Sequence, residues 1–249
     1  MCANYCSVIS LNRFLELVIQ NKMYSNRRNL IRYFDYMFGS LNLSGKRVLD
    51  IGGGAGLLTF YAVVKGAEAI CLEPEFDGCT TGMIERFNHF KGLLPIPEAK
   101  ISSQAVTFND FEDPEQFDVI IMANSINHLD ESACEKLHFN QSARQTYLKQ
   151  LKKMYDLLKS NGRIIVSDCN RRNFFNDIGL KSPFMPSIEW RKHQPPCVWL
   201  DLMHQVGFQP VSKQWTVPNS LGKYGSIFLA NPMVAYFLLS HFRIEARKL

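Results

Sequence analysis

The chain has 249 residues, which suits one domain of ordinary size with room for a cap. Its 46% of apolar and 20% of charged residues are typical of a globular protein with a full core. No apolar run approaches the ~20 residues that a membrane-spanning helix needs, so we expect no membrane partner. The net charge of +5 is mild and the basic residues are spread along the chain, which does not favour nucleic acid as a partner.

Seven cysteines stand at irregular intervals, and none of them forms a C-x-x-C pair. This pattern argues against a disulfide framework and against a structural zinc site. The N-terminus lacks the basic-then-apolar layout of a secretory signal peptide. We therefore expect a reduced, cytoplasmic protein.

Apolar residues at helical spacing predict helices within residues 11–41, before a turn and a first buried strand at 47–51. Further strands are predicted at 69–73, 101–106, 117–123 and 163–168, and helices at 57–65, 77–91, 143–159 and 195–206. The last two helices are expected to end at Asn161-Gly162 and at Gly207. Two alternating segments, 211–217 and 241–247, indicate a closing antiparallel pair. The alternation of strands and helices predicts an α/β fold with a mostly parallel sheet.

The first predicted strand runs directly into glycines at every second position, which are Gly52, Gly54 and Gly56. A strand that turns over glycines into a helix start forms a cradle for an anionic or polar ligand. The backbone can turn tightly there, and the helix end offers N–H groups. A dinucleotide fingerprint, G-x-G-x-x-G, would need glycine where the chain has Leu57 or Thr59, so the spacing argues against NAD.

The observed pattern is D-x-G-x-G-x-G, from Asp50 to Gly56. It resembles motif I of the class I S-adenosylmethionine-dependent methyltransferases. The resemblance implies a Rossmann-like, seven-stranded, mostly parallel sheet with helices on both faces and a helical substrate cap. Residues 1–42 would form this N-terminal cap and residues 43–249 the core, with lid insertions at about 170–195 and 219–239.

The same resemblance implies S-adenosylmethionine as the cofactor. Asp50 and the backbone at Gly52 and Gly54 would hold its methionine part, with Gly56 completing the turn. Glu73 ends the second predicted strand, 17 residues past Gly56. An acidic side chain there can accept hydrogen bonds from both ribose hydroxyls of a bound nucleoside.

Other cofactor contacts are expected after the third predicted strand. A polar residue there would face the adenine amine. Gln104 is the candidate, with Thr107 or Asp110 as alternatives.

Two further groups complete the predicted cofactor site. Ala123 and Asn124, at the end of the fourth predicted strand, would lie beside the methionine end. Either Arg27 or Arg28 could pair with the cofactor carboxylate, or the two could form a solvated basic turn.

Motifs of the resembled family exclude several methyl acceptors. The segment Asn124-Ser125-Ile126-Asn127 lacks the N-P-P-Y-like tetrad of enzymes that methylate base amines or glutamine amides. No acidic loop matches the glutamate pair of protein arginine methyltransferases. Neither Cys134 nor Cys169 follows proline, as the nucleophile of cytosine C5 enzymes does. Asn124 and Asp168-Cys169-Asn170 do not reproduce the carboxylates of metal-dependent catechol-type enzymes, so we expect no metal ion.

We therefore expect a small-molecule acceptor, with oxygen favoured as the methylated atom. His128 is the first candidate for a general base, because it follows the fourth strand, where the sheet edge opens to ligands. An imidazole suits proton abstraction from a hydroxyl or phenol. His193, in a polar and aromatic loop, is the alternative. A carboxylate could orient such a ring, for example Asp168 or Glu189 acting on His128. Histidine at position 128 could also be a packing and capping residue.

Three residues are candidates for substrate contacts. Trp190 could form a wall for a ring-bearing or anionic acceptor, or it could anchor a lid helix. Arg171 and Phe174 follow the fifth predicted strand. They could recognise a carboxylate, phosphate or sugar acid, or they could belong to a solvated helix start.

The sequence thus predicts a cytoplasmic methyltransferase, monomeric or homodimeric, that methylates a hydroxyl of a natural-product, polyketide-like or sugar molecule by in-line transfer with histidine help. N- or C-methylation of a small molecule is the nearest alternative. RNA methylation would call for a concentrated basic face or an added RNA module. A non-catalytic methyltransferase-like scaffold would be recognised by the absence of cofactor binding.

Overall fold

The computed structural model describes residues 9–39, 41–75, 81–219, 222, 225 and 228–249. Contacts between Cα atoms divide the chain into two compact units, Met1–Ile121 and Met122–Leu249. The predicted cap segments 1–42 and 219–239 and the predicted helix 77–91 extend partly outside the described residues. The cap boundaries therefore stay predictions.

The first unit is built on parallel strands. β1 (Arg47–Ile51) lies between β2 (Glu68–Leu72) and β4 (Phe117–Ala123), and β3 (Ile101–Gln104) lies on the far side of β2. Nearly all of β1, β2 and β4 is buried, which explains their continuous apolar runs. The bounds of β1 and β4 are those predicted from the sequence.

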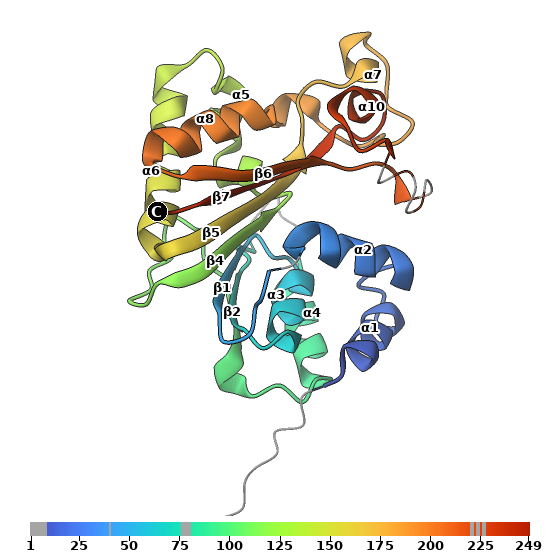
Figure 1. Ribbon diagram of the computed structural model, residues 1–249, viewed down its shortest axis with the longest axis vertical. Helices are drawn as coiled ribbons and strands as arrows, with labels where there is room; N and C mark the ends of the chain where they lie inside the picture. The colour runs from blue at the N-terminus through green and yellow to red at the C-terminus, as the bar shows by residue number, and fades with distance from the viewer. Residues whose placement is uncertain (1–8, 40, 76–80, 220–221, 223–224, 226–227) are drawn as a thin grey trace, which may run out of the picture. The chain divides into compact units, whose positions relative to one another are not determined.

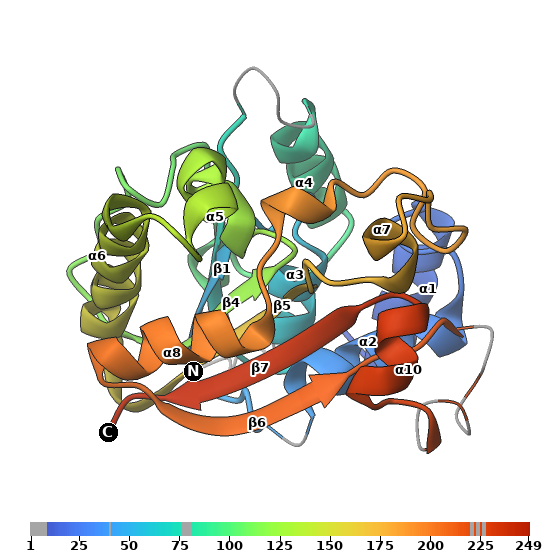
Figure 2. The ribbon, with the colours of Figure 1, turned by 90° about the horizontal axis from the view of Figure 1, so that it is seen from above.

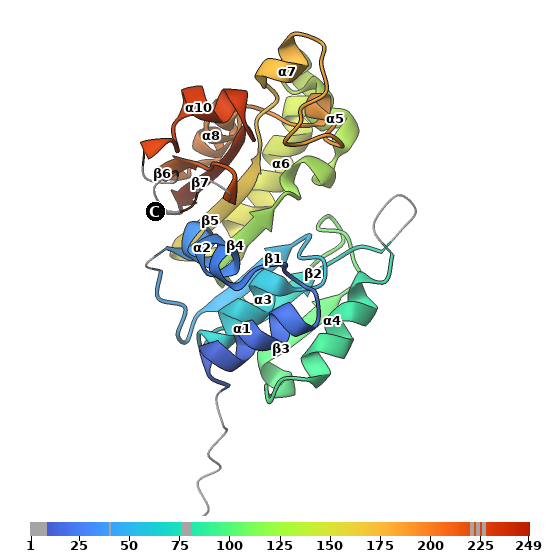
Figure 3. The same ribbon diagram turned by 90° about the vertical axis from the view of Figure 1, so that its right-hand side faces the viewer.

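The helices of this unit are α1 (Leu11–Gln20), α2 (Arg27–Phe38), α3 (Leu57–Val64) and α4 (Met83–Gly92), with a 3-10 turn η1 (Glu98–Lys100). α3 packs on β1 and β2, and α1 packs on α2 and α3, as Figures 1 and 3 show. Aromatic rings fill the space between these helices, and the fully buried ones are Phe14, Phe34, Phe60, Phe87 and Phe90. This packing fixes the position of α3, whose N-terminus follows the glycine turn.

The second unit contains β5 (Leu158–Cys169), β7 (His241–Arg247) and β6 (Gln209–Trp215), in that spatial order. β7 is antiparallel to both neighbours, which confirms the predicted closing pair. The full strand order is β3-β2-β1-β4-β5-β7-β6, a seven-stranded and mostly parallel sheet. The predicted Rossmann-like fold class is therefore confirmed.

The helices of the second unit are α5 (Glu131–Lys136), α6 (Gln141–Leu157), α7 (Phe174–Asp177), α8 (Pro196–Val206) and α10 (Pro232–Phe237), with 3-10 turns η2 (Ile126–Leu129) and η3 (Trp190–Lys192). α8 packs against α6 and lies along β6 and β7 (Figure 2). It ends at Gly207 in the left-handed conformation, as predicted. Between residues 9 and 249, apart from the gaps in the described segments, no helix is long and apolar enough to span a membrane.

The predicted end of the long helix at Asn161-Gly162 is wrong. α6 ends at Leu157, and β5 begins with the next residue. Lys248, near the end of the chain, is the cause, because its backbone exchanges hydrogen bonds with Asn161 and Gly162 and draws them into the sheet. Its Nζ also donates to the carbonyl oxygens of Tyr155 and Leu158, which satisfies the helix end. A contact this distant in sequence leaves no local signal.

We expect Gly56→Ala to lower the free energy of unfolding by about 2–4 kcal/mol. Gly56 has a φ of 81°, so a side chain there is strained, and its Cβ would overlap the Phe87 ring. Gly82→Ala is the matched control, because Gly82 also begins a helix, at a φ of 79°, but nothing described lies within 4 Å of its Cβ. Urea unfolding should give the control a loss of only about 1–2 kcal/mol. Equal losses would show that Phe87 does not constrain this position.

Candidate cofactor and acceptor sites

The glycine turn has the conformation that its spacing predicts. Gly52, Gly54 and Gly56 have φ values of 68°, 56° and 81°, in the left-handed region that other residues rarely adopt. Gly56 is the residue before α3, and as a glycine it has no side chain with which to cap that helix. The turn thus ends at a helix N-terminus, where backbone N–H groups favour an anionic or polar ligand.

Gly53 is a constrained residue that the sequence reasoning missed. A Cβ at this position would lie 2.6 Å from Cys71 Sγ and 2.8 Å from Asp50 Oδ2, which is closer than atoms can pack. The glycine run itself was the available signal, but the clash depends on a neighbour from β2. Gly54 differs, since among the described residues only Met83 Sδ, at 4.0 Å, would meet its Cβ. Side chains therefore pack tightly against the turn at Gly53, whereas the described residues leave space beside Gly54.

Glu73 closes the turn. Its Oε2 accepts a hydrogen bond of 2.7 Å from the N–H of Gly54. The N–H groups of Gly52 and Gly53 bond to the carbonyl oxygen of Leu72, at 2.8 and 3.2 Å. The end of β2 therefore holds the turn through backbone and side chain, and the half-buried Glu73 carboxylate lies beside the open face of Gly54.

Asp50 lies beneath the turn and is 1% exposed. Its Oδ2 accepts a hydrogen bond of 2.7 Å from the hydroxyl of Thr59 on α3, whereas its Oδ1 is buried and has no hydrogen-bond partner among the described residues. Burial raises the pKa of Asp50 to about 6, although the Thr59 hydrogen bond acts in the opposite direction. Thr59 was not a predicted site residue, because a threonine inside an apolar helix gives no functional signal.

The other predicted cofactor residues of this unit differ in their placement. Gln104 ends β3, and its carbonyl oxygen accepts from the N–H of Glu73 at 3.1 Å, so the two residues are neighbours. Thr107 and Asp110 bond to each other at 2.6 Å. Arg28 is exposed in the first turn of α2, where its backbone N–H bonds to the capping Asn26. The roles of all these residues stay predictions.

These features fit a nucleoside with an aminoacyl end. Glu73 offers a carboxylate to hydroxyl donors beside open backbone at Gly54. Asp50 carries an unpartnered buried oxygen, which a cationic or N–H-rich group would satisfy. These carboxylate acceptors therefore fit the ribose hydroxyls and the ammonium group of S-adenosylmethionine, which are hydrogen-bond donors.

In the second unit, Asn124 follows β4 with a φ of 56°, a conformation that asparagine tolerates better than most residues. Its N–H donates to the carbonyl oxygen of Ser167 at 2.7 Å, and its Oδ1 lies 2.7 Å from Nε2 of His241. Burial lowers the pKa of His241 to about 4, although the charge of Asp168 opposes this shift. A neutral imidazole therefore fixes the residue after Ala123. Sequence reasoning did not identify His241, because it stands at the start of an ordinary strand.

His193 and Asp168 form a carboxylate–imidazole pair. Nδ1 of His193 lies 2.9 Å from Oδ1 of Asp168, and the two side chains are 13% and 0% exposed. The other Asp168 oxygen is buried and lacks a hydrogen-bond partner in the described part of the chain. A buried carboxylate at this distance fixes the orientation of the ring.

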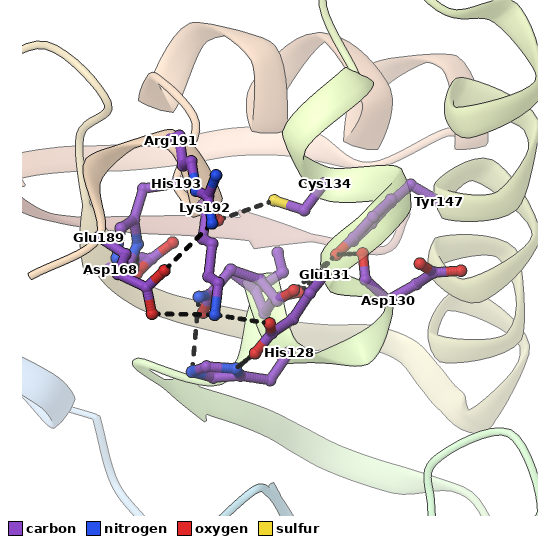
Figure 4. Close-up of polar contacts among 12 residues, drawn as sticks. His128, Asp130, Glu131, Cys134, Tyr147, Asp168, Glu189, Arg191, Lys192 and His193 are labelled. Atoms are coloured by element: carbon purple, nitrogen blue, oxygen red, sulfur yellow. Dashed lines mark hydrogen bonds and ion pairs between the residues drawn. The ribbon is translucent and has the colours of Figure 1, made fainter. Parts of the chain in front are cut away.

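His128 has a different partner from those predicted. Its Nδ1 lies 2.6 Å from Oε1 of Glu131 (Figure 4). The other oxygen of Glu131, Oε2, pairs with Nζ of Lys192 at 2.9 Å. Glu189 pairs with Lys192 at 3.0 Å, and Asp168 pairs with His193. The suggested pairs of His128 with Asp168 or Glu189 are therefore wrong. The His128 side chain is 56% exposed, and water weakens its ion pair.

The three predicted substrate residues contact other parts of the protein. Trp190 is only 7% exposed, which favours the anchoring role. Arg171 donates to the carbonyl oxygen of Glu135 at 3.0 Å. Phe174 lies against Phe237, with ring centroids 5.0 Å apart. Contacts with an acceptor stay predictions for all three.

Across the described residues, no group of three or more histidine, cysteine, aspartate or glutamate side chains could hold a metal ion. The His193–Asp168 pair is well protected from water, since its two side chains are 13% and 0% exposed.

We expect the contribution of Asp50 to the stability of the protein to fall as the pH rises from about 4 to 7. Folding raises the pKa of Asp50 from 3.8 to about 6, so the folded state binds this proton more tightly and gains most stability when Asp50 is protonated. A difference of one between the folded and unfolded pKa corresponds to about 1.4 kcal/mol, so ionising Asp50 costs the folded state about 3 kcal/mol. Asp50→Asn removes this cost. Urea unfolding measures the free energy of unfolding of both proteins at pH 4 and pH 7. From pH 4 to pH 7, the free energy of the variant relative to the wild type should rise by about 3 kcal/mol. If the two proteins change in parallel with pH, the raised pKa of Asp50 is contradicted.

Comparison with known proteins supports the assignment drawn from the geometry. A family model described as a methyltransferase domain matches residues 20–213. No curated protein matches the chain. Many solved structures do, at low sequence identity.

An S-adenosylmethionine-dependent methyltransferase from Mesorhizobium loti is 14% identical, with a TM-score of 0.57 over 92% of this chain and 100% of its own. The N-methyltransferase NodS from Bradyrhizobium japonicum WM9, in complex with S-adenosylhomocysteine, is 14% identical, with a TM-score of 0.55 over 95% and 97% of the two chains. Magnesium protoporphyrin IX methyltransferase from Synechocystis PCC 6803 is 11% identical, with a TM-score of 0.57 over 97% and 89%. At these identities the structures share the fold. The family match covers well over half of the chain, so the chain belongs to the methyltransferase domain family, as its resemblance to the class I S-adenosylmethionine-dependent methyltransferases predicted.

Proposed function

We propose that this protein transfers the methyl group of S-adenosylmethionine to a small-molecule acceptor, with His193 as the general base. The observation that carries the proposal is the 2.9 Å contact between Nδ1 of His193 and the fully buried Asp168. The family match supports methyl transfer, and the buried pair supports a protein-held base.

The cofactor would be held by residues of the first unit. Glu73 accepts hydrogen bonds from the ribose hydroxyls, and Gly54 lets the ligand approach the backbone closely. The unpartnered oxygen of Asp50 interacts with the ammonium group. When bound, S-adenosylmethionine supplies a methyl group that its positively charged sulfur activates for attack.

His193 removes the proton that the acceptor must lose. With its Nδ1–H donated to Asp168, the ring presents the lone pair of Nε2 to an acceptor O–H or N–H. The Asp168 carboxylate then stabilises the imidazolium that forms, as in other carboxylate–imidazole pairs. The loss of this proton leaves the acceptor atom free to attack the methyl group in line.

His193 suits this role better than His128, although the sequence favoured His128. The His193 side chain is 13% exposed, whereas that of His128 is 56% exposed. Glu131, the partner of His128, also pairs with Lys192, and that hydrogen bond lowers the pKa of Glu131. A carboxylate that is shared with a lysine is less available to orient a neighbouring imidazole.

The acceptor atom is proposed to be a hydroxyl oxygen of a natural-product, polyketide-like or sugar molecule, since an imidazole base suits hydroxyls and phenols. Methylation of nitrogen or carbon is the alternative. One similar structure is an N-methyltransferase and another is a magnesium protoporphyrin IX methyltransferase, so the fold accommodates different acceptors. A cytoplasmic location and a monomeric or homodimeric state belong to the same proposal.

We expect Glu73→Gln to weaken the binding of S-adenosylhomocysteine about 5- to 150-fold, because a charge-assisted hydrogen bond to ribose is worth about 1–3 kcal/mol. Calorimetric titration of the purified chain measures this effect. Glu75→Gln is the matched control, since Glu75 is exposed and bonds to the backbone of Ile84. No binding of S-adenosylhomocysteine to the wild type would favour the non-catalytic scaffold instead.

We expect His193→Gln to lower turnover about 10²- to 10⁴-fold, which is the usual contribution of a general base. Acceptors are found first by screening hydroxylated and amino compounds with labelled S-adenosylmethionine. His128→Gln is the matched control and should lose less than about tenfold. Both variants should bind S-adenosylhomocysteine as the wild type does. Should His128→Gln cause the larger loss, the assignment of the base must be reversed.

A further inference from the structure

His193 lies in a segment that cannot hold an imidazole in place by itself. Of residues 189–195, only the 3-10 turn η3 has regular structure, and it ends at Lys192. A loop residue loses conformational entropy when it is fixed, so its orientation needs contacts from a more rigid element. The neighbouring element is α5, which contacts η3.

Cys134 of α5 bonds to the residues on both sides of His193. Its carbonyl oxygen accepts a hydrogen bond of 2.5 Å from Nε2 of Gln194, and its thiol lies 3.2 Å from the carbonyl oxygen of Lys192. Figure 4 shows the thiol directed at Lys192. Burial raises the pKa of Cys134 to about 12, so the thiol keeps the proton that it donates. Two bonds to one helical residue thus enclose His193.

We call the two hydrogen bonds of Cys134, to Gln194 and to Lys192, the Cys134 clamp. The ion pairs around this clamp contribute less to fixing the loop. Lys192 pairs with Glu131 and Glu189, and Arg191 lies 3.5 Å from Glu135, but the carboxylates are 31–53% exposed. Exposed ion pairs are worth at most about 1 kcal/mol, because water screens them. Gln194 and Cys134, in contrast, are both fully buried.

Gln194 carries a cost that packing alone does not explain. Its Oε1 is buried and has no hydrogen-bond partner within the described ranges, while its Nε2 is bound to Cys134. A half-satisfied buried amide is less stable than an apolar side chain of the same size. The directed bond from Nε2 is therefore the property that distinguishes glutamine from methionine at this position.

We propose that Gln194 is a positioning residue, which holds His193 against Asp168 by tying the loop to Cys134 of α5. This inference rests on the proposed function, in which His193 is the base. Gln194 itself touches neither the cofactor nor the acceptor in this account. It acts through the orientation and the tautomer of the His193 ring.

The test measures the tautomer of His193 by NMR in the full chain. Long-range correlation of the ring nitrogens with carbon-bound ring protons distinguishes Nδ1–H from Nε2–H. Asp168→Asn provides the reference for a ring that has lost its carboxylate. Gln194→Met removes the bond but keeps the volume, and Gln205→Met is the matched control. Gln205 is exposed on α8 and bonds only to the surface residue Asp201 among the contacts described for it.

We expect Nδ1–H in the wild type and in Gln205→Met, and a shift toward the Asp168→Asn spectrum in Gln194→Met. The melting temperature of Gln194→Met should equal or exceed that of the wild type. Once an acceptor is known, the kcat of Gln194→Met should fall about 10- to 100-fold while its KM for S-adenosylmethionine stays unchanged. A misplaced base slows the reaction but does not weaken cofactor binding.

A wild-type spectrum in Gln194→Met would overturn the proposal, as would Nε2–H in the wild type. If Gln194→Met does not fold, Cys134→Val tests the second bond of the same clamp, with Cys134→Ser as the conservative variant that retains a donor. Titration of the same samples with S-adenosylhomocysteine separates the two claims. Failure to bind it would contradict the proposed function, whereas a retained tautomer would contradict only the role of Gln194.

Discussion

The parallel pairing of β1 with β2 is the constraint on which the glycine turn and the candidate cofactor site depend. Its register sets Ile51 opposite Leu72, so the glycine turn leaves β1 at the level where β2 ends. Gly52 and Gly53 can then bond to Leu72, and Gly54 to the Glu73 carboxylate. A shift of one residue would turn Glu73 to the opposite face of the sheet and break this arrangement.

This local character explains why the glycine turn could be predicted from the sequence. The roles of its residues toward a cofactor stay predictions. The turn and its acid each follow directly from the end of a strand, and both strands are marked by short buried runs. The strand bounds, the left-handed glycines and the contact between Gly54 and Glu73 all depend on residues close to these runs. Gly53 shows where this reasoning ends. Its need for glycine arises from Cys71, a side chain of the adjacent strand.

The histidine pairs could not be predicted in the same way. His193 and Asp168 are separated by 25 residues, which include a short helix and irregular loops without a readable period. α5, which holds the His193 loop, has only six residues, too few for apolar spacing to reveal a helix. Position after a strand favoured His128, but burial decides which imidazole is held away from water, and burial depends on loop packing. The same limit explains the misplaced end of α6, where Lys248 determines the boundary.

Three buried oxygens without hydrogen bonds among the described residues lower the stability of the fold at the candidate sites. Oδ1 of Asp50, Oδ2 of Asp168 and Oε1 of Gln194 are all buried, and none has a hydrogen-bond partner in the described segments. Each such group costs about 1–3 kcal/mol or more relative to a satisfied one. An apolar core would avoid this loss, so stability alone does not account for polar residues at these positions. A cationic ligand at Asp50 would recover part of it. The same desolvation that raises the pKa of Asp50 makes its carboxylate a stronger partner for an ammonium group than an exposed acid would be.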